Sequence, residues 1–150
     1  MKQIKVGIKC EEGVIHKPQY QKISDAGADI YPLLKEDENY FLMPGERKLF
    51  PTGIKMEIPD GYEIQVRPRS GLAFKKGISV LNAPGTVDAG YKGDVGIILI
   101  NHGTEEFKIT SETAIAQLVL KEVIQAVFEE VDELSESDRG EGGFGHTGNM

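Results

Sequence analysis

The sequence predicts an all-β fold, a jelly-roll-like sandwich or barrel, with one short helix. Short segments alternate apolar and polar residues, as in Ile4-Lys5-Val6 and Ile64-Gln65-Val66, and this period of two is typical of half-buried strands. Turn sequences rich in Pro and Gly separate the segments, among them Pro59-Asp60-Gly61 and Ala83-Pro84-Gly85. Many short strands punctuated by such turns are typical of antiparallel sandwiches, jelly rolls and barrels.

The expected strands cover much of the chain. The first is expected over residues 4–8, and the one helical pattern covers residues 70–76, with Ser70 as a candidate N-cap and Gly77 as the stop. The other strands are expected over residues 28–31, 47–50, 54–58, 62–66, 78–81, 94–101, 107–110, 114–121 and 125–131.

Composition limits the class of protein. The 150 residues include 17 Lys and Arg against 24 Asp and Glu, a net charge of -7, which fits one acidic domain and argues against broad binding to nucleic acids. Cys10 is the only cysteine, and the Cys and His residues lack the paired spacing of zinc sites. The longest apolar stretch, residues 95–100, is far shorter than the roughly 18 residues of a membrane span, and the N-terminus lacks a secretory signal pattern. We therefore expect a cytoplasmic protein with no membrane or nucleic-acid partner.

The composition changes near the C-terminus. Residues 132–138 (DELSESD) are acidic and polar, and residues 139–150 (RGEGGFGHTGNM) contain five glycines. Such segments bury little apolar surface. We expect a β domain over residues 1–131, followed over residues 132–150 by an acidic linker and a flexible glycine-rich tail that belongs functionally to the same domain.

One candidate site lies in the segment Arg67-Pro68-Arg69-Ser70-Gly71. Guanidinium groups, a hydroxyl and the free N–H groups of a helix start together suit a phosphate. A surface strand end followed by a capped helix would give the same pattern without any ligand.

A second candidate is the glycine-rich loop at residues 82–94, in which Asp88 is a candidate general base and Tyr91 a packing face for a sugar or base. Asp in such a loop is, however, often only a turn residue, and Tyr in a strand often belongs to the core. In the tail, Arg139 and Phe144 stand among glycines and could contact phosphate and base, although a tail of this composition can also lack any ligand.

Five segments, taken in order, resemble the five motifs of the trimeric dUTPase family, enzymes that hydrolyse deoxyuridine triphosphate. They are residues 25–30 (DAGADI), 68–73 (PRSGLA), 85–94 (GTVDAGYKGD), 114–119 (AIAQLV) and 139–148 (RGEGGFGHTG). The resemblance implies a jelly-roll fold and hydrolysis of dUTP to dUMP and pyrophosphate, a reaction that keeps uracil out of DNA and supplies dUMP for dTMP synthesis.

The resemblance also implies roles for single positions. Asp88 corresponds to the catalytic aspartate that activates a water for attack on the α-phosphorus, and Tyr91 to the aromatic residue that packs against deoxyribose. Asp29 is expected to act through hydrogen bonds or through water. Further substrate contacts are implied for Asn82, Gly85 and Gly96 in the uracil loop, for Thr86 and Val87 beside them, for Arg69, Ser70, Gly71 and Gln117 at the phosphates, and for Arg139, Phe144, Gly145, His146 and Thr147 in a closing tail.

The same resemblance implies Mg²⁺ held mainly by substrate phosphates and water, with no protein ligand assigned, and a homotrimer whose chains share their active sites. Two alternatives stay open at this point. A related dCTP deaminase would need a Glu on the strand after the Asp88 turn, where this chain has Ile98. A catalytically silent nucleotide-binding module would have no need of Asp88, Arg139 and Phe144 together.

Overall fold

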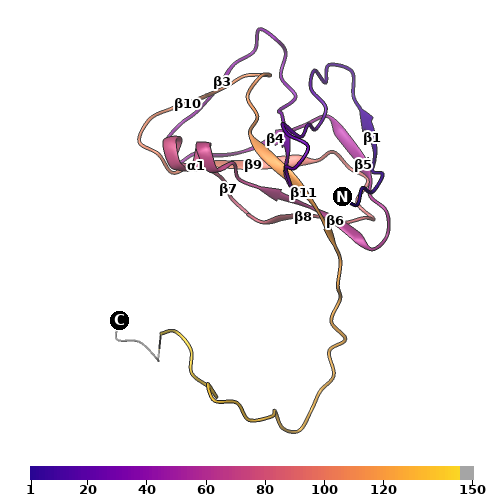
Figure 1. Ribbon diagram of the computed structural model, residues 1–150. Coiled ribbons are helices and arrows are strands. Elements are labelled where there is room, and N and C mark those ends of the chain that lie inside the picture. Colours follow the sequence, from indigo (N-terminus) through magenta and orange to yellow (C-terminus); the bar gives the residue numbers. More distant parts are fainter. Residues whose placement is uncertain (146–150) are drawn as a thin grey trace.

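The computed structural model describes residues 1–145, which form eleven short strands and one helix. Figure 1 shows a compact β body from which the C-terminal segment extends. The elements are β1 (Gly7–Cys10), β2 (Ala28–Ile30), β3 (Tyr40–Leu42), β4 (Arg47–Pro51), β5 (Ile54–Glu57), β6 (Tyr62–Arg67), α1 (Ser70–Lys76), β7 (Ile78–Val80), β8 (Gly85–Val87), β9 (Gly96–Asn101), β10 (Phe107–Ile109) and β11 (Ala116–Glu122).

Two antiparallel sheets make the body. One has the strand order β2-β11-β6-β8 and the other the order β4-β9-β7, while β1 pairs with β5 and β3 with β10. Neighbours in these sheets are distant in sequence, which is typical of jelly rolls and Greek-key sandwiches. The predicted all-β fold of the jelly-roll type, with one short helix, is confirmed.

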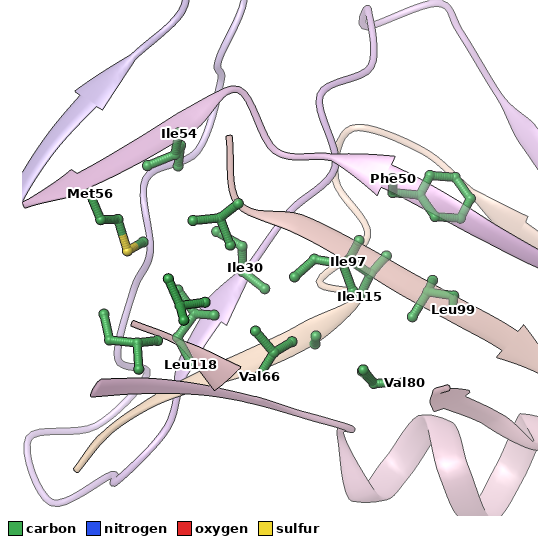
Figure 2. Close-up of a cluster of buried hydrophobic side chains, with 14 of the residues drawn as sticks. Ile30, Phe50, Ile54, Met56, Val66, Val80, Ile97, Leu99, Ile115 and Leu118 are labelled. Atoms are coloured by element: carbon green, nitrogen blue, oxygen red, sulfur yellow. The ribbon is translucent and has the colours of Figure 1, made fainter. Parts of the chain in front are cut away.

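The core lies between the sheets, and Figure 2 shows its side chains pointing toward one another from several strands. Strand β9 shows why the sequence alternates: Ile97 and Leu99 are fully buried, whereas Ile98 between them is partly exposed. Burying large aliphatic side chains stabilises such a sandwich by about 1.5–3 kcal/mol each. The labelled core residues of Figure 2 are Ile30, Phe50, Ile54, Met56, Val66, Val80, Ile97, Leu99, Ile115 and Leu118.

Three strand predictions need correction. The first strand begins later than expected, at Gly7, where its register with β5 begins. The sequence does not predict strands β3 and β8, because Tyr40-Phe41-Leu42 lacks alternation and residues 85–87 lie in a glycine-rich segment that favours a loop. The strand expected over residues 125–131 is absent, since after β11 this segment leaves the body (Figure 1) and has no strand beside it.

The helix has the predicted bounds but a different start. Ser70 is its first helical residue rather than its N-cap, which is Arg69, and no side chain caps the N-terminus. Gly77 ends the helix as predicted: its φ of 69° is left-handed, and its N–H bonds the carbonyls of Leu72 and Ala73. No helix within residues 1–145 is long and apolar enough to cross a membrane.

Candidate active site

Three segments that are far apart in the sequence meet at Arg69. Arg69 lies between the end of β6 and the start of α1, and its Nε is 3.2 Å from Oδ1 of Asp29 on β2. Its Nη1 donates a hydrogen bond of 3.1 Å to the carbonyl of Ala114, just before β11. The Asp29 side chain is 12% exposed and that of Arg69 is 37% exposed. The guanidinium is therefore fixed on one side by a nearly buried carboxylate and remains accessible on the other.

Gln117 fixes the backbone beside Arg69. On β11 it lies between Asp29 of β2 and Arg67 of β6 in the sheet register, and its Nε2 donates to the Pro68 carbonyl at 2.9 Å. A side chain at position 27 would overlap the Gln117 amide, so Gly27 leaves the space that this amide occupies. The first, second and fourth motif segments thus form one connected cluster, which we call the clamp: Asp29, Arg69, Ala114 and Gln117.

Ser70 and Gly71 form the exposed first turn of α1, next to the clamp. This turn contains no acidic side chain, and no side chain of any kind caps the N-terminus of the helix. The first N–H groups of a helix have no partner within the helix. Together with Arg69 they make this end of β6 a positively polarised surface that suits an anion.

Asp88 follows β8 directly and is exposed on a braced turn. The Tyr91 N–H donates to the Asp88 carbonyl at 3.0 Å, which closes the turn. Lys92 ties the turn to β5, because its Nζ donates to the Ala89 carbonyl at 3.2 Å and lies 3.2 Å from Oε1 of Glu57. The Asp88 carboxylate is therefore open to solvent on a backbone with a defined shape.

Tyr91 is half-exposed, with 48% of its surface accessible, so it is not the core residue considered as an alternative. Its hydroxyl donates to the Asp94 carbonyl at 2.7 Å, which leaves the ring at the surface beside Asp88. Gly93 makes room for this ring, because a Cβ there would overlap the phenol. The ring can thus serve as a packing face for a sugar.

The loop before Asp88 presents small residues. Gly85 pairs with Val66, and a Cβ on it would lie 3.2 Å from Val66 Cβ and 3.4 Å from the Asn82 amide nitrogen. Asn82 and Thr86 are exposed, whereas Val87 is buried against the core. Gly85 is itself buried, so its missing side chain permits the close packing of β8 against β6, and its contact with substrate remains a prediction.

Gly96 lies elsewhere, at the start of β9 in the other sheet. A Cβ at this position would come 2.6 Å from Leu49 Cδ1, so packing against β4 already accounts for the glycine. Its contact with substrate remains a prediction.

The clamp and Asp88 lie at opposite ends of one strand pair. Val87 pairs with Ile64 on β6, so the antiparallel register places Asp88 beside Glu63. Arg69 lies six residues after Glu63 along the chain, beyond the other end of β6. At about 3.3 Å per residue this separates the two backbones by roughly 20 Å. The two groups therefore lie at well-separated positions of the sheet within one chain.

The described part of the tail lies away from the body (Figure 1). Arg139 and Gly142 form a local turn in which the Gly142 N–H donates to the Arg139 carbonyl at 3.2 Å. Phe144 is fully exposed and has a left-handed φ of 51°, and Gly145 follows it. His146 and Thr147 lie outside the described residues.

Mg²⁺ prefers carboxylate and phosphate oxygens. Within residues 1–145, no three His, Cys, Asp or Glu side chains are grouped around a common point. Both Asp29 oxygens are engaged, by Arg69 and by Gln21, whose Nε2 lies 3.0 Å from Oδ2. The Asp88 carboxylate is exposed, whereas in Asp94 of the same segment Oδ2 accepts the Thr52 N–H at 3.2 Å and the buried Oδ1 has no hydrogen-bond partner among the described residues. Either carboxylate could contact a cation through water.

Sequence reasoning missed the supporting contacts of Gln21, Glu57 and Lys92. Gln21 lies in an exposed loop, and nothing in its neighbours indicates that it faces Asp29 eight residues later. The Lys92 and Glu57 pair depends on how β5 lies beside the Asp88 turn. These contacts follow from tertiary structure, for which single residues in a loop give no signal.

Comparison with known proteins gives one consistent result. A family model described as dUTPase matches residues 14–148. The chain is 53% identical over 131 residues to a deoxyuridine 5'-triphosphate nucleotidohydrolase of Nautilia profundicola, covering 87% of this chain and 89% of the relative. It is 49% identical over 148 residues to the protein of the same name from Syntrophotalea carbinolica, covering 99% of each.

Solved structures agree with this result. The dUTPase of Staphylococcus bacteriophage 80alpha with dUpNHpp superposes with a TM-score of 0.84 and 26% identity, covering 97% of this chain and 99% of the other. A point mutant of the dUTPase from phage phi11 of S. aureus, described with a structural Mg(II) ion, shares the fold with a TM-score of 0.76 at 22% identity, covering 87% of this chain and 98% of the other.

Proposed function

The chain belongs to the dUTPase family, and from this membership and the site geometry we propose that it hydrolyses dUTP to dUMP and pyrophosphate. The reaction removes a precursor of uracil in DNA and supplies dUMP for dTMP synthesis. One observation carries the proposal. Within the residues that the family model matches, the motif segments form two parts of a site: the clamp at Arg69 and the exposed carboxylate of Asp88.

Asp88 acts as the general base in this proposal. Its carboxylate accepts a proton from a water molecule while the water oxygen attacks the α-phosphorus. The bond between the α-phosphorus and its bridging oxygen to the β-phosphate breaks, and pyrophosphate leaves. A positioned base of this kind typically contributes about 10²–10⁴-fold. Tyr91 packs against the deoxyribose, where a 2'-hydroxyl would need additional space.

The clamp binds the negative charge of the substrate. Arg69 presents the free edge of its guanidinium, with Ser70 and Gly71 beside it and Gln117 holding the backbone. Asn82, Gly85, Thr86, Val87 and Gly96 remain the proposed base-side contacts. Mg²⁺ would bridge phosphate oxygens and screen their charge, held mainly by the substrate and by water.

We propose that the active form is a homotrimer with shared sites. The separation of roughly 20 Å between Asp88 and Arg69 within one chain supports a site built from two chains. Two exposed apolar regions support an interface as well. Leu49, with 58% of its surface exposed, lies beside Ile98 on the outer face of the second sheet, and the segment after β11 exposes Ile124, Val127 and Phe128 almost completely.

The C-terminal tail closes over the nucleotide in this proposal. Residues 1–131 then act as the β domain, and residues 132–150 as linker and lid. Arg139 supplies charge to the phosphates, Phe144 and Gly145 cover the base, and His146 and Thr147 add polar contacts. Closure excludes water and strengthens the electrostatic interactions inside the site.

The dCTP deaminase alternative finds no support in β9. Ile98 pairs with Leu49 in the sheet, and no carboxylate occupies its position. The presence of Asp88 on a turn held by hydrogen bonds likewise favours an active enzyme rather than a module that binds the nucleotide without hydrolysing it. The proposed location is the cytoplasm, where deoxynucleoside triphosphates serve DNA synthesis, and a lone Cys10 fits a reducing compartment.

Pyrophosphate release from dUTP, UTP, dTTP and dCTP, each with and without Mg²⁺, tests the proposal. We expect strong preference for dUTP and dependence on the metal. Appearance of dUTP or dUMP from dCTP would instead establish deamination, and binding of dUTP without any product would establish a silent module.

A further inference from the structure

We propose that Gln21 is a positioning residue for phosphate binding: its amide orients Asp29, and Asp29 in turn fixes the guanidinium of Arg69. The inference rests on the proposed function and adds a residue outside the five motif segments. Gln21 does not touch substrate in this account and acts only through its two neighbours.

The two oxygens of Asp29 have separate partners. Oδ1 lies 3.2 Å from Arg69 Nε, and Oδ2 accepts a hydrogen bond of 3.0 Å from Gln21 Nε2. The terminal torsion of Asp is broad, so a carboxylate held through one oxygen can rotate. With both oxygens held, the plane of the carboxylate is fixed and Oδ1 points at Arg69.

The backbone determines where Gln21 lies. Gln19 forms an isolated bridge with Asp29, with hydrogen bonds of 3.1 and 2.8 Å in the two directions. The next residues turn sharply, because the Asp25 carboxylate accepts the Lys22 N–H at 2.9 Å. Gln21, two residues beyond the bridge, is thus held over the edge of β2 beside the Asp29 side chain.

Arg69 gains a fixed orientation from this arrangement. The Asp29 carboxylate forms an ion pair with its Nε and the Ala114 carbonyl accepts a hydrogen bond from its Nη1, so partners on two different segments orient the guanidinium. The Arg69 side chain remains 37% exposed, so part of the guanidinium stays accessible. Preorganisation of one long side chain saves the cost of ordering it on binding, which corresponds to about 3- to 10-fold in affinity.

The test is a double-mutant cycle on the full-length chain. Dissociation constants for dUpNHpp are measured for the wild type, Gln21→Ala, Arg69→Ala and the double mutant, together with kcat and KM for dUTP. We expect Gln21→Ala to raise Kd and KM about 3- to 10-fold with kcat within about twofold. In the Arg69→Ala background the same change should have no further effect, because coupled residues are not additive.

Two further variants separate hydrogen bonding from shape. Gln21→Glu keeps the size of the side chain but places a carboxylate against Asp29, so its Kd should exceed that of Gln21→Ala. Ser24→Ala is the matched control: Ser24 is exposed in the same loop, and its hydroxyl makes no hydrogen bond with residues 1–145. This control should match the wild type. If Arg69→Ala does not fold, Arg69→Gln replaces it and keeps a donor for Asp29.

An unchanged Kd in Gln21→Ala would overturn the proposal. So would a loss of affinity on Gln21→Ala that is equally large with Arg69 and with Ala at position 69. A lower Tm with kcat and KM both altered would indicate a structural role and also overturn it. A wild type that neither binds dUpNHpp nor hydrolyses dUTP would refute the proposed function instead, so the two failures are distinguishable.

Discussion

The clamp and the Asp88 turn differ in how complete they are within one chain. Around Arg69, an ion pair and two hydrogen bonds connect the β2, β6 and β11 regions, and Asp29 is nearly buried. Around Asp88 only the backbone is braced, and both the carboxylate and the Tyr91 ring face solvent. The clamp is thus preassembled, whereas the proposed catalytic carboxylate, Asp88, is exposed to solvent.

The two regions differ because binding a charged group and activating a water make different demands on the surroundings of a side chain. A charged group that must be oriented in advance is held by buried partners, because water would otherwise compete for it. A general base needs access to water and substrate, and the exposed turn of Asp88 suits that proposed role. In the proposed trimer, a second chain brings the two together at one nucleotide.

The largest expected effect comes from Asp88→Asn. The amide keeps the shape of the side chain but cannot accept the proton, so kcat should fall about 10²–10⁴-fold with the affinity for dUpNHpp nearly unchanged. Pyrophosphate release and titration calorimetry measure the two quantities. Asp60→Asn, which changes another exposed turn carboxylate, serves as the control. Unchanged turnover in Asp88→Asn would contradict the role of Asp88.

A chain ending at Asp138 tests the tail. The described residues beyond this point make only local hydrogen bonds with residues 137–142, so the shortened chain should fold and assemble as the full chain does. Its turnover should drop by about tenfold or more, which corresponds to about 1.4 kcal/mol of lost transition-state stabilisation. Sedimentation and circular dichroism check assembly and folding. Loss of the oligomer would show that the tail is structural.

Gly27→Ala tests the rigidity of the clamp. The added Cβ overlaps the Gln117 amide and must displace it from the Pro68 carbonyl. We expect a several-fold rise in KM and a loss of about 1–3 kcal/mol in the free energy of unfolding. Ala26→Ser changes the exposed neighbouring residue and should alter neither quantity. Wild-type KM in Gly27→Ala would show that the Gln117 contact is dispensable.

Glu46→Gln should have the smallest effect on activity, because Glu46 lies neither in the clamp nor in the Asp88 turn. Hydrogen bonds from the Tyr40 hydroxyl and then from the Met43 N–H lower the pKa of Glu46 below its ordinary value of 4.5. The ionised carboxylate therefore stabilises the fold above that value, and the stabilisation disappears as pH falls through the lowered pKa of the folded state. The stability difference between wild type and variant should shrink below about pH 4.5, with turnover at pH 7 unchanged. A difference that is independent of pH, measured by urea denaturation, would contradict this assignment.

Much of the fold was predictable from local pattern. The alternation around Ile64 and Val66 and the helix stop at Gly77 reflect backbone geometry and burial within a few residues, so the sequence reveals them directly. Strand β3 was missed because Tyr40, Phe41 and Leu42 are all apolar and give no period. The segment after residue 124 alternates like a strand but has no strand to pair with in a single chain.

The candidate site was predictable only in its residue types. Asp29 and Arg69 both stand in motif segments, but their ion pair depends on β2 and β6 each pairing with β11. Gln21 carried no signal at all, since an exposed Gln in a loop is ordinary. Contacts between segments 40 or more residues apart depend on strand register, which local patterns do not specify.

Mixing two inactive variants tests the sharing of sites between chains most directly. Asp88→Asn and Arg69→Ala chains are unfolded together, refolded at equal amounts and assayed for dUTP hydrolysis beside each variant refolded alone. In randomly assembled trimers about a quarter of the sites would combine an intact Asp88 from one chain with an intact Arg69 from another. The account predicts recovery toward about a quarter of wild-type activity. Mixed trimers that form, as shown by mass spectrometry, but stay as inactive as the separate variants would contradict it.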